Sequence, residues 1–131
     1  MRTFQRSIKT ETSYSGIGLH TGNETTITFK PAKVNTGIKF IRKDLKNSPE
    51  IPAIIDNVID ISRGTTLGIG DIKIHTVEHV LAAIAGLEID NIIVELSNNE
   101  PPVGDGSALP FVDTLLKAGF VDQDAFRNYL V

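Results

Sequence analysis

The segment HTVEHVLAAIAGLEIDNIIVELS, residues 75–97, changes from a helical to an extended pattern and decides the fold class. The apolar residues of its first half recur at the intervals of an amphipathic helix: Val77, Val80, Leu81, Ile84 and Leu87. This helix should begin near His75 or Thr76 and end in a left-handed cap at Gly86. The second half, residues 90–97, predicts a buried strand because of its run of Ile92, Ile93 and Val94.

The segments on either side extend this pattern. Residues 24–30, 37–42 and 52–61 are rich in β-branched residues and predict further strands. A second helix follows residue 107, with Ser107 as N-cap, Pro110 in the first turn and Gly119 after the end. Its predicted apolar stripe consists of Phe111, Val112, Leu115 and Leu116. Strands followed by helix, strand and helix indicate an α+β domain of two layers.

Composition narrows the class of protein. The chain has 131 residues, 40% hydrophobic and 22% charged, which is typical of one globular domain. It has no cysteine, so disulfide scaffolds and thiolate metal sites are excluded. A net charge of −3 argues against a nucleic-acid partner. We find no apolar run long enough for a membrane span and no signal-peptide core, and we expect a cytoplasmic domain.

The start of the first helix contains the main candidates for catalytic or metal-binding residues. On a helical projection His75, Glu78 and His79 lie opposite the apolar stripe. A histidine beside a glutamate is the pair that hydrolytic zinc sites use, and HxxEH also fits the inverted zinc-protease motif. The alternative is that both histidines are ordinary polar helix residues. His20, in the glycine-rich segment 15–22, is a third candidate, although its position alone favours a turn residue over a ligand.

The same face of this helix continues with small or apolar residues instead of charged ones: Ala82, Ala85, Gly86 and Ile89. Small residues allow another backbone to approach closely. We therefore expect the helix to lie between its own sheet and a partner layer, either a second domain or a second subunit.

The loop at residues 100–107 and three single carboxylates remain to be interpreted. The segment 100–107 is a stiff loop that leads into a helix N-terminus, where it could bind an anion or only form a turn with a cap. The carboxylates of Asp44, Glu50 and Asp122 are scattered singly, and we expect them to be solvated.

Three motifs together resemble the N-terminal half of UDP-3-O-acyl-N-acetylglucosamine deacetylase, the zinc enzyme that commits bacteria to lipid A synthesis. The motifs are SGIGLHTG (15–22), TVEHVLAAIAGLEIDN (76–91) and DGSALPFV (105–112). The resemblance covers essentially the whole chain. It implies the first of two similar domains, residues 1–131, with a mostly antiparallel sheet packed against two helices and the second domain absent from this chain.

The resemblance also implies roles for individual residues. His79 corresponds to a zinc ligand, Glu78 to the catalytic general base, and His20 to a residue that handles the UDP-linked acylated glucosamine substrate. The segment 62–66 corresponds to a loop that lines the cleft, and Asp105 should support the junction between loop and helix. His75 has no metal role in the family.

The remaining zinc ligands, a histidine and an aspartate, and a catalytic histidine are implied to come from the second domain. No histidine follows His79 in this sequence, so we expect the isolated chain to be inactive. The alternatives are an inverted-motif metalloprotease fragment that uses His75 and His79 together, and a non-catalytic assembly domain that retains the fold.

The C-terminal segment gives two weaker indications. Residues 126–131 resemble the opening of a further strand. Residues 122–129 are similar to the form of the enzyme that is fused to a hydroxyacyl-carrier-protein dehydratase, although no dehydratase sequence is present.

Overall fold

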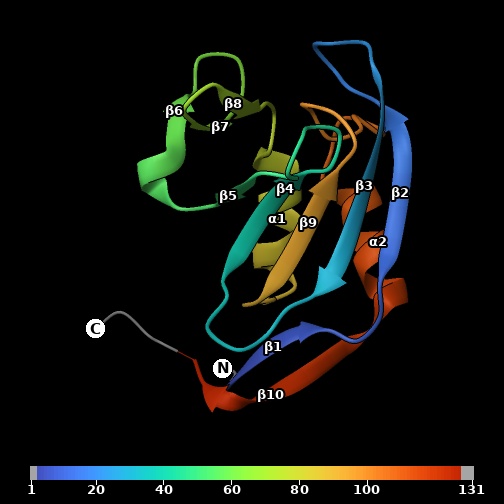
Figure 1. Cartoon of the computed structure of the whole chain (residues 1–131). Helices are drawn as coiled ribbons and strands as arrows, with labels where there is room; N and C mark the ends of the chain where they lie inside the picture. Colours follow the sequence, from blue (N-terminus) through green and yellow to red (C-terminus); the bar gives the residue numbers. More distant parts are fainter. Residues whose placement is uncertain (1–2, 128–131) are drawn as a thin grey trace.

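A five-stranded sheet forms one layer of the domain, and the computed structural model describes residues 3–127 of the chain. The strand order is β2-β3-β9-β4-β5, and only the β4–β9 pair is parallel within this sheet (Figure 1). The strands are β2 (Thr12–Ile17), β3 (Glu24–Pro31), β4 (Ile38–Arg42), β5 (Glu50–Pro52) and β9 (Ile92–Leu96). The strands predicted at 24–30, 37–42 and 90–97 are therefore confirmed.

The centre of the core is built on β9, because Val94 pairs with Phe29 of β3 on one side and Phe40 of β4 on the other. All three side chains are fully buried. Alternate residues of a strand point to opposite faces, so the polar residues between them face away from the core. This alternation is the pattern that the sequence displays.

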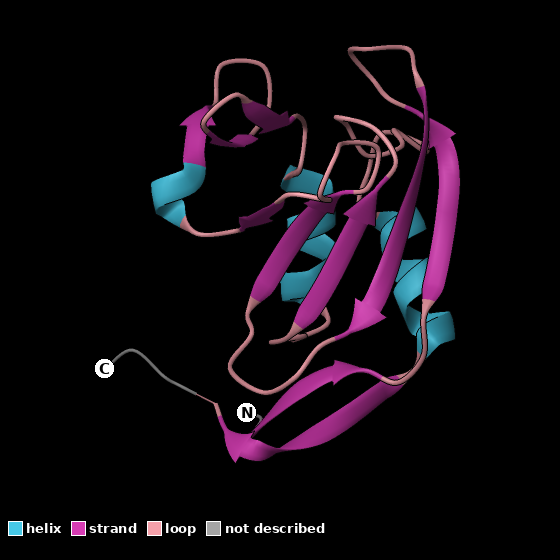
Figure 2. Cartoon of the chain, in the orientation of Figure 1, coloured by secondary structure: helices cyan, strands magenta, loops and turns pink. Residues whose placement is uncertain are grey.

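Two helices cover the same face of this sheet and form the second layer (Figures 1 and 2). Helix α1 (Glu78–Gly86) buries Val80 and Ile84, and α2 (Leu109–Ala118) buries Phe111 and Leu115. The predicted α+β fold, with a mostly antiparallel sheet packed against two helices, is confirmed.

The end of α1 differs from the prediction. Gly86 is the last helical residue and has no positive φ; the left-handed residue is Glu88, with φ 55°. Glu88 N–H donates to Ala85 O and Ile89 N–H donates to Ile84 O, which is the hydrogen-bond pattern of a Schellman motif. Ile89 is thereby directed into the core, where it is only 5% exposed, so it does not belong to the small-residue face.

The stripe of α2 is also shifted. Leu116 is 51% exposed, whereas Thr114 and Ala118 are buried beside Leu115. The N-cap residue is Ala108 and not Ser107 as predicted, although Ser107 Oγ still accepts a hydrogen bond of 3.1 Å from the N–H of Leu109. Small or weakly polar residues can occupy the buried face where α2 packs closely on its neighbours, so apolarity alone does not identify that face.

Residues 52–61 do not form the single strand that was predicted. They divide into the end of β5, a 3-10 turn (Ile55–Asn57) and β6 (Val58–Asp60). The turn is fixed by the Asn57 side chain, whose Nδ2 donates to Pro52 O at 2.7 Å. β6 then pairs with β7 (Thr66–Ile69), and β7 with β8 (Ile72–Ile74), in a separate small sheet (Figure 1).

A two-stranded sheet of β1 (Phe4–Ile8) and β10 (Phe120–Phe126) lies beyond the lower end of the main sheet (Figure 1). Asn91 connects it to the rest of the domain by donating through Nδ2 to the side-chain oxygens of Gln5 and Gln123, at 2.8 and 2.7 Å. The strand expected from residue 126 onward is thus wrong at its start, since β10 ends at Phe126. Residues 128–131 of the first C-terminal prediction and 128–129 of the second lie outside the described residues.

One of the carboxylates that were expected to be solvated, that of Asp44, is paired instead. Asp44 accepts hydrogen bonds from Nε and Nη2 of Arg42 at 2.9 and 2.6 Å, and these bonds hold the pKa of the Asp44 carboxyl below its ordinary value. Arg42 is nearly buried and also donates to Lys73 O. Glu50 is 51% exposed, in agreement with the expectation, and its Oε1 lies 3.8 Å from Lys39 Nζ.

Candidate functional site

Three segments that are distant in the sequence meet above the start of α1. They are the loop between β2 and β3, the loop between β6 and β7, and residues 75–76. Together they line a cavity of about 290 Å³ whose walls include His20, Arg63, Gly64, Thr66, His75 and Thr76. The predicted grouping of His20 with the segment 62–66 around one cleft agrees with this arrangement.

Glu78 and His79 are the first two residues of α1. They do not line the cavity itself, but the Glu78 carboxylate lies against Gly64, which does. Each side chain is 36% exposed, and Glu78 Oε2 is 4.0 Å from His79 Nε2. The backbone N–H of Thr65 donates to Glu78 Oε1 at 2.9 Å, which fixes one carboxylate oxygen. The positive end of the helix dipole at this N-terminus stabilises the negative charge of Glu78.

Gly64 explains how the β6–β7 loop approaches this carboxylate so closely. It has φ +108°, a conformation that other residues rarely adopt, and a Cβ at this position would lie 2.9 Å from Glu78 Oε2. The Gly64–Thr65 pair is therefore a backbone support for Glu78. The sequence signal for it is a lone glycine in a polar segment, which is too common to indicate a role by itself.

His75 is not on the helix, contrary to the helical projection. Thr76 has φ 58°, a left-handed conformation that is unusual for a β-branched residue, and it breaks the helical period between His75 and His79. The His75 N–H donates to Asn99 O at 2.8 Å, and its Nδ1 lies 3.2 Å from Thr66 Oγ1. The two histidines thus do not form the pair on successive helical turns that the inverted-protease motif needs.

The described residues supply too few ligands for a complete metal site. Within residues 3–127, no group of three or more His, Asp or Glu side chains is arranged to hold a metal ion. A catalytic zinc ion usually has three protein ligands and one open position. His79 and the adjacent carboxylate of Glu78 are of the right chemical type for such a site but supply only part of it.

Asp105 lies in the loop before α2, near enough to His79 for their charges to interact. It accepts hydrogen bonds from Ser107 Oγ and N–H at 2.6 and 2.9 Å, and these bonds lower its pKa, assisted by the nearby charge of His79 when that ring is protonated. The expectation that Asp105 supports the junction between the loop and α2 agrees with these contacts. In segment 100–107 the Asp105 side chain forms a turn with Ser107, directly before the Ala108 N-cap of α2.

The sequence interpretation missed Glu100, which is fully buried between the β2–β3 loop and the start of α1. Its carboxylate accepts hydrogen bonds from His20 N–H and from Thr76 Oγ1, at 3.0 and 2.6 Å. The only sequence signal is an acidic residue just before two prolines, which does not distinguish it from a solvated loop carboxylate.

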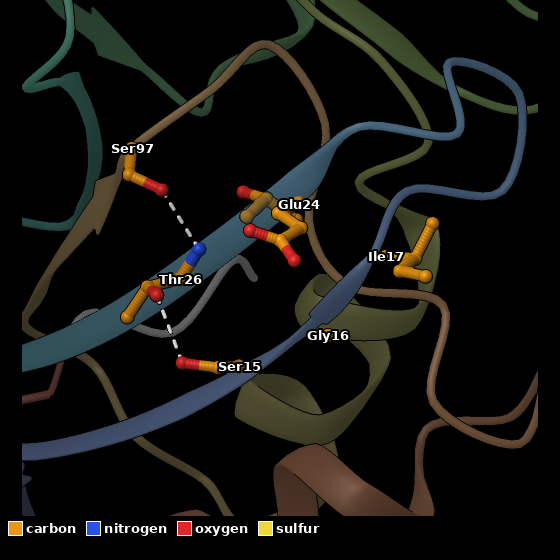
Figure 3. A pocket seen from close by; sticks show the side chains of 7 residues that line it. Ser15, Gly16, Ile17, Glu24, Thr26 and Ser97 are labelled. Atoms are coloured by element: carbon orange, nitrogen blue, oxygen red, sulfur yellow. Dashed lines mark hydrogen bonds between the residues drawn. The ribbon is translucent and has the colours of Figure 1, made fainter.

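A larger hollow of about 570 Å³ lies at the β2–β3 edge of the sheet (Figure 3), and it shares no lining residue with the cavity described above. Its hydroxyl groups bond within the wall: Ser15 Oγ lies 2.8 Å from Thr26 Oγ1, and Ser97 Oγ accepts from Thr26 N–H at 2.8 Å. Glu24 is the one charged residue among those that line it. The smaller cavity is therefore the better candidate for a functional site.

The chain matches a protein family and two known relatives in sequence. Residues 5–131 match the family described as UDP-3-O-acyl N-acetylglycosamine deacetylase. The chain is 61% identical over 131 residues to the "Bifunctional enzyme LpxC/FabZ" of Chlorobaculum tepidum. It is 47% identical over 128 residues to the "UDP-3-O-acyl-N-acetylglucosamine deacetylase" of Shewanella halifaxensis. These alignments cover 100% and 97% of this chain but 28% and 42% of the relatives, so the chain spans less than half the length of either.

Proposed function

The chain belongs to the UDP-3-O-acyl N-acetylglycosamine deacetylase family, and from this premise we propose that it forms the N-terminal domain of a zinc-dependent deacetylase. The proposed reaction is hydrolysis of the N-acetyl group of UDP-3-O-acyl-N-acetylglucosamine, the committed step of lipid A biosynthesis. The observation that carries the proposal is the adjacent pair of Glu78 and His79 at the start of α1, supported by the Thr65 N–H.

Glu78 is the proposed general base. Its Oε1 is occupied by the hydrogen bond from Thr65, whereas Oε2 is the oxygen nearer to His79. A carboxylate held in this way can accept the proton of the attacking water without reorienting. His79 would supply one imidazole ligand to zinc, which when bound polarises the amide carbonyl and lowers the pKa of water. His20, at the wall of the cavity, is the proposed substrate-binding residue.

The remaining zinc ligands would come from a second domain, which we propose packs on the outer face of α1. Ala82, Ala85 and Gly86 are exposed on this face, although they are small and uncharged. A solvated helix face normally carries charged residues, so this composition favours coverage by another layer. On this proposal, the 131-residue chain alone does not bind zinc tightly and does not catalyse the reaction.

Other parts of the proposal rest on composition and resemblance. We propose a cytoplasmic enzyme with a nucleotide-sugar substrate and no nucleic-acid partner. Among residues 3–127, no helix is long and apolar enough to cross a membrane. The similarity of residues 122–129 to the dehydratase-fused form stays a prediction.

Two measurements test the proposal. The first is zinc content and deacetylase activity of the chain, alone and with a second domain supplied in trans. We expect weak zinc binding and no turnover alone, and both properties after reconstitution. Turnover by the chain alone would contradict the proposal, and a reconstituted complex that stays inert would favour the assembly-domain alternative.

The second measurement compares variants of the reconstituted enzyme. Glu78→Gln should lower kcat by about 10²–10⁴-fold with zinc retained, and His79→Ala should lose zinc. His75→Ala is the matched control, because that residue lies outside the helix and should leave the zinc content unchanged. Loss of zinc in His75→Ala would instead support the metalloprotease alternative.

A further inference from the structure

Glu100 has no part in the proposed reaction, yet it is the most fully enclosed acidic group near the cavity, with 0% exposure. Its Oε1 accepts from the N–H groups of His20 and Thr21, at 3.0 and 3.1 Å, and from Thr21 Oγ1 at 3.2 Å. Its Oε2 accepts from Thr76 Oγ1 at 2.6 Å and lies 3.1 Å from His20 Nδ1. Both carboxylate oxygens thus have hydrogen-bond partners, which come from the β2–β3 loop and from Thr76 before α1.

The glycine-rich loop is shaped around this carboxylate. A Cβ on Gly18 would lie 2.4 Å from Glu100 Oε1, which is closer than real contacts allow. Glycine-rich loops whose successive N–H groups converge commonly bind anions. Here the anion that fills the loop is a side chain of the protein itself.

The hydrogen-bond partners of Glu100 determine whether its carboxyl group and the Nδ1 of His20 carry a proton. Burial raises the pKa of the Glu100 carboxyl, but the hydrogen bonds from Thr76, Thr21 and His20 lower it, and the net pKa lies below its ordinary value. An ionised carboxylate only accepts hydrogen bonds, and Thr76 directs its one hydroxyl hydrogen to Oε2. The Nδ1 of His20 lies within reach of these two groups, so it must carry a proton in order to bond to either.

We propose that Glu100 is a positioning residue that fixes His20 as the Nδ1–H tautomer, so that Nε2 is the acceptor presented to the cavity. The ring of His20 is 44% exposed and belongs to the cavity wall, so Nε2 would accept a hydrogen bond from an N–H or O–H group of a bound polar ligand. Its importance for deacetylation rests on the proposed function, whereas the tautomer itself does not.

The same carboxylate also holds the entry to α1. Thr76 keeps its left-handed conformation while its hydroxyl donates to Glu100, two residues before Glu78. One buried group therefore couples the orientation of His20 to the position of the first turn of α1.

The test is the ¹⁵N NMR spectrum of the histidine rings in the 131-residue chain, which contains only three histidines. At about pH 8.5, above the ordinary histidine pKa, protonated and unprotonated ring nitrogens have well-separated shifts. We expect His20 to have its proton on Nδ1. A wild-type His20 protonated on Nε2 would overturn the proposal without any variant.

Glu100→Gln provides the second part of the test. The amide retains the shape of the carboxylate, but its NH₂ group can donate to Nδ1, so the His20 proton should move to Nε2. Glu24→Gln, at an exposed position on the sheet, is the matched control and should leave the spectrum of His20 unchanged. A Glu100→Gln protein that folds with the original tautomer would refute the positioning role. Because neither substrate nor zinc is needed, this result is distinct from any failure of the proposed function.

Discussion

Replacement of Gly18 by alanine tests the packing at the glycine-rich loop directly. The new Cβ would lie 2.4 Å from Glu100 Oε1, whereas ordinary contacts begin at 3.4 Å, so the carboxylate must move by about 1 Å. That movement would weaken the three hydrogen bonds that Oε1 accepts from His20 and Thr21. Hydrogen bonds to charged groups contribute about 1.5–3 kcal/mol each, and partial relaxation should keep the total loss at about 2–4 kcal/mol.

The assay is urea denaturation followed by circular dichroism, with the melting temperature as a second readout. For a domain of this size the loss corresponds to a fall in Tm of about 6–15 °C. Gly86→Ala is the matched control: nothing lies within 4 Å of its new Cβ, and alanine is favoured within a helix, so this variant should gain about 0.5–1 kcal/mol. If Gly18→Ala is as stable as the wild type, the reasoning about the enclosed carboxylate is wrong.

Three further predictions concern the rest of the domain. Asp44→Asn should lower the free energy of unfolding by about 1–2 kcal/mol at neutral pH. Because Arg42 depresses the folded pKa of Asp44, this contribution is present above about pH 4 and is lost on further acidification, so unfolding curves of wild type and variant should converge at low pH. Leu115→Ala, at a fully buried position, should cost about 2–5 kcal/mol in chemical denaturation, whereas Leu116→Ala, at a 51% exposed position, should cost about 0.5 kcal/mol or less. Glu88→Gly should raise Tm, because glycine relieves about 1 kcal/mol of left-handed strain; a fall in Tm would show that the Schellman turn does not form.

The parts of the fold that could be predicted from the sequence are those in which burial follows a local period. Phe29 and Phe40 are buried on strands in which inward-facing and outward-facing residues alternate. Val80 and Ile84 are buried on a helix, four residues apart. In both cases the spacing of the apolar residues predicts which side chains are buried. The segment that leads into the small sheet of β6, β7 and β8 breaks this rule. Ile55, in the 3-10 turn before β6, is 86% exposed, and an apolar residue that is not buried gives a misleading period.

The candidate site shows the same division. Glu78 and His79 could be identified because they are adjacent in the sequence and match a family motif. The exclusion of His75 from the helix could not be predicted, since it depends on one left-handed residue, Thr76. Glu100 was missed because its role arises only where the β2–β3 loop and the start of α1 meet in space.

The pairing of β1 with β10 has a consequence for how the domain folds. Phe4 stacks on Phe126 with ring centroids 5.3 Å apart, so partners at opposite ends of the described chain must meet. Closing so long a loop costs entropy before any contact compensates for it, and such non-local pairing slows folding. During synthesis β1 leaves the ribosome before β10, with all the other strands and both helices of this chain made between them. Its Ile8, fully buried in the finished core, therefore lies in a strand that cannot pair until Phe120 of β10 has been synthesised.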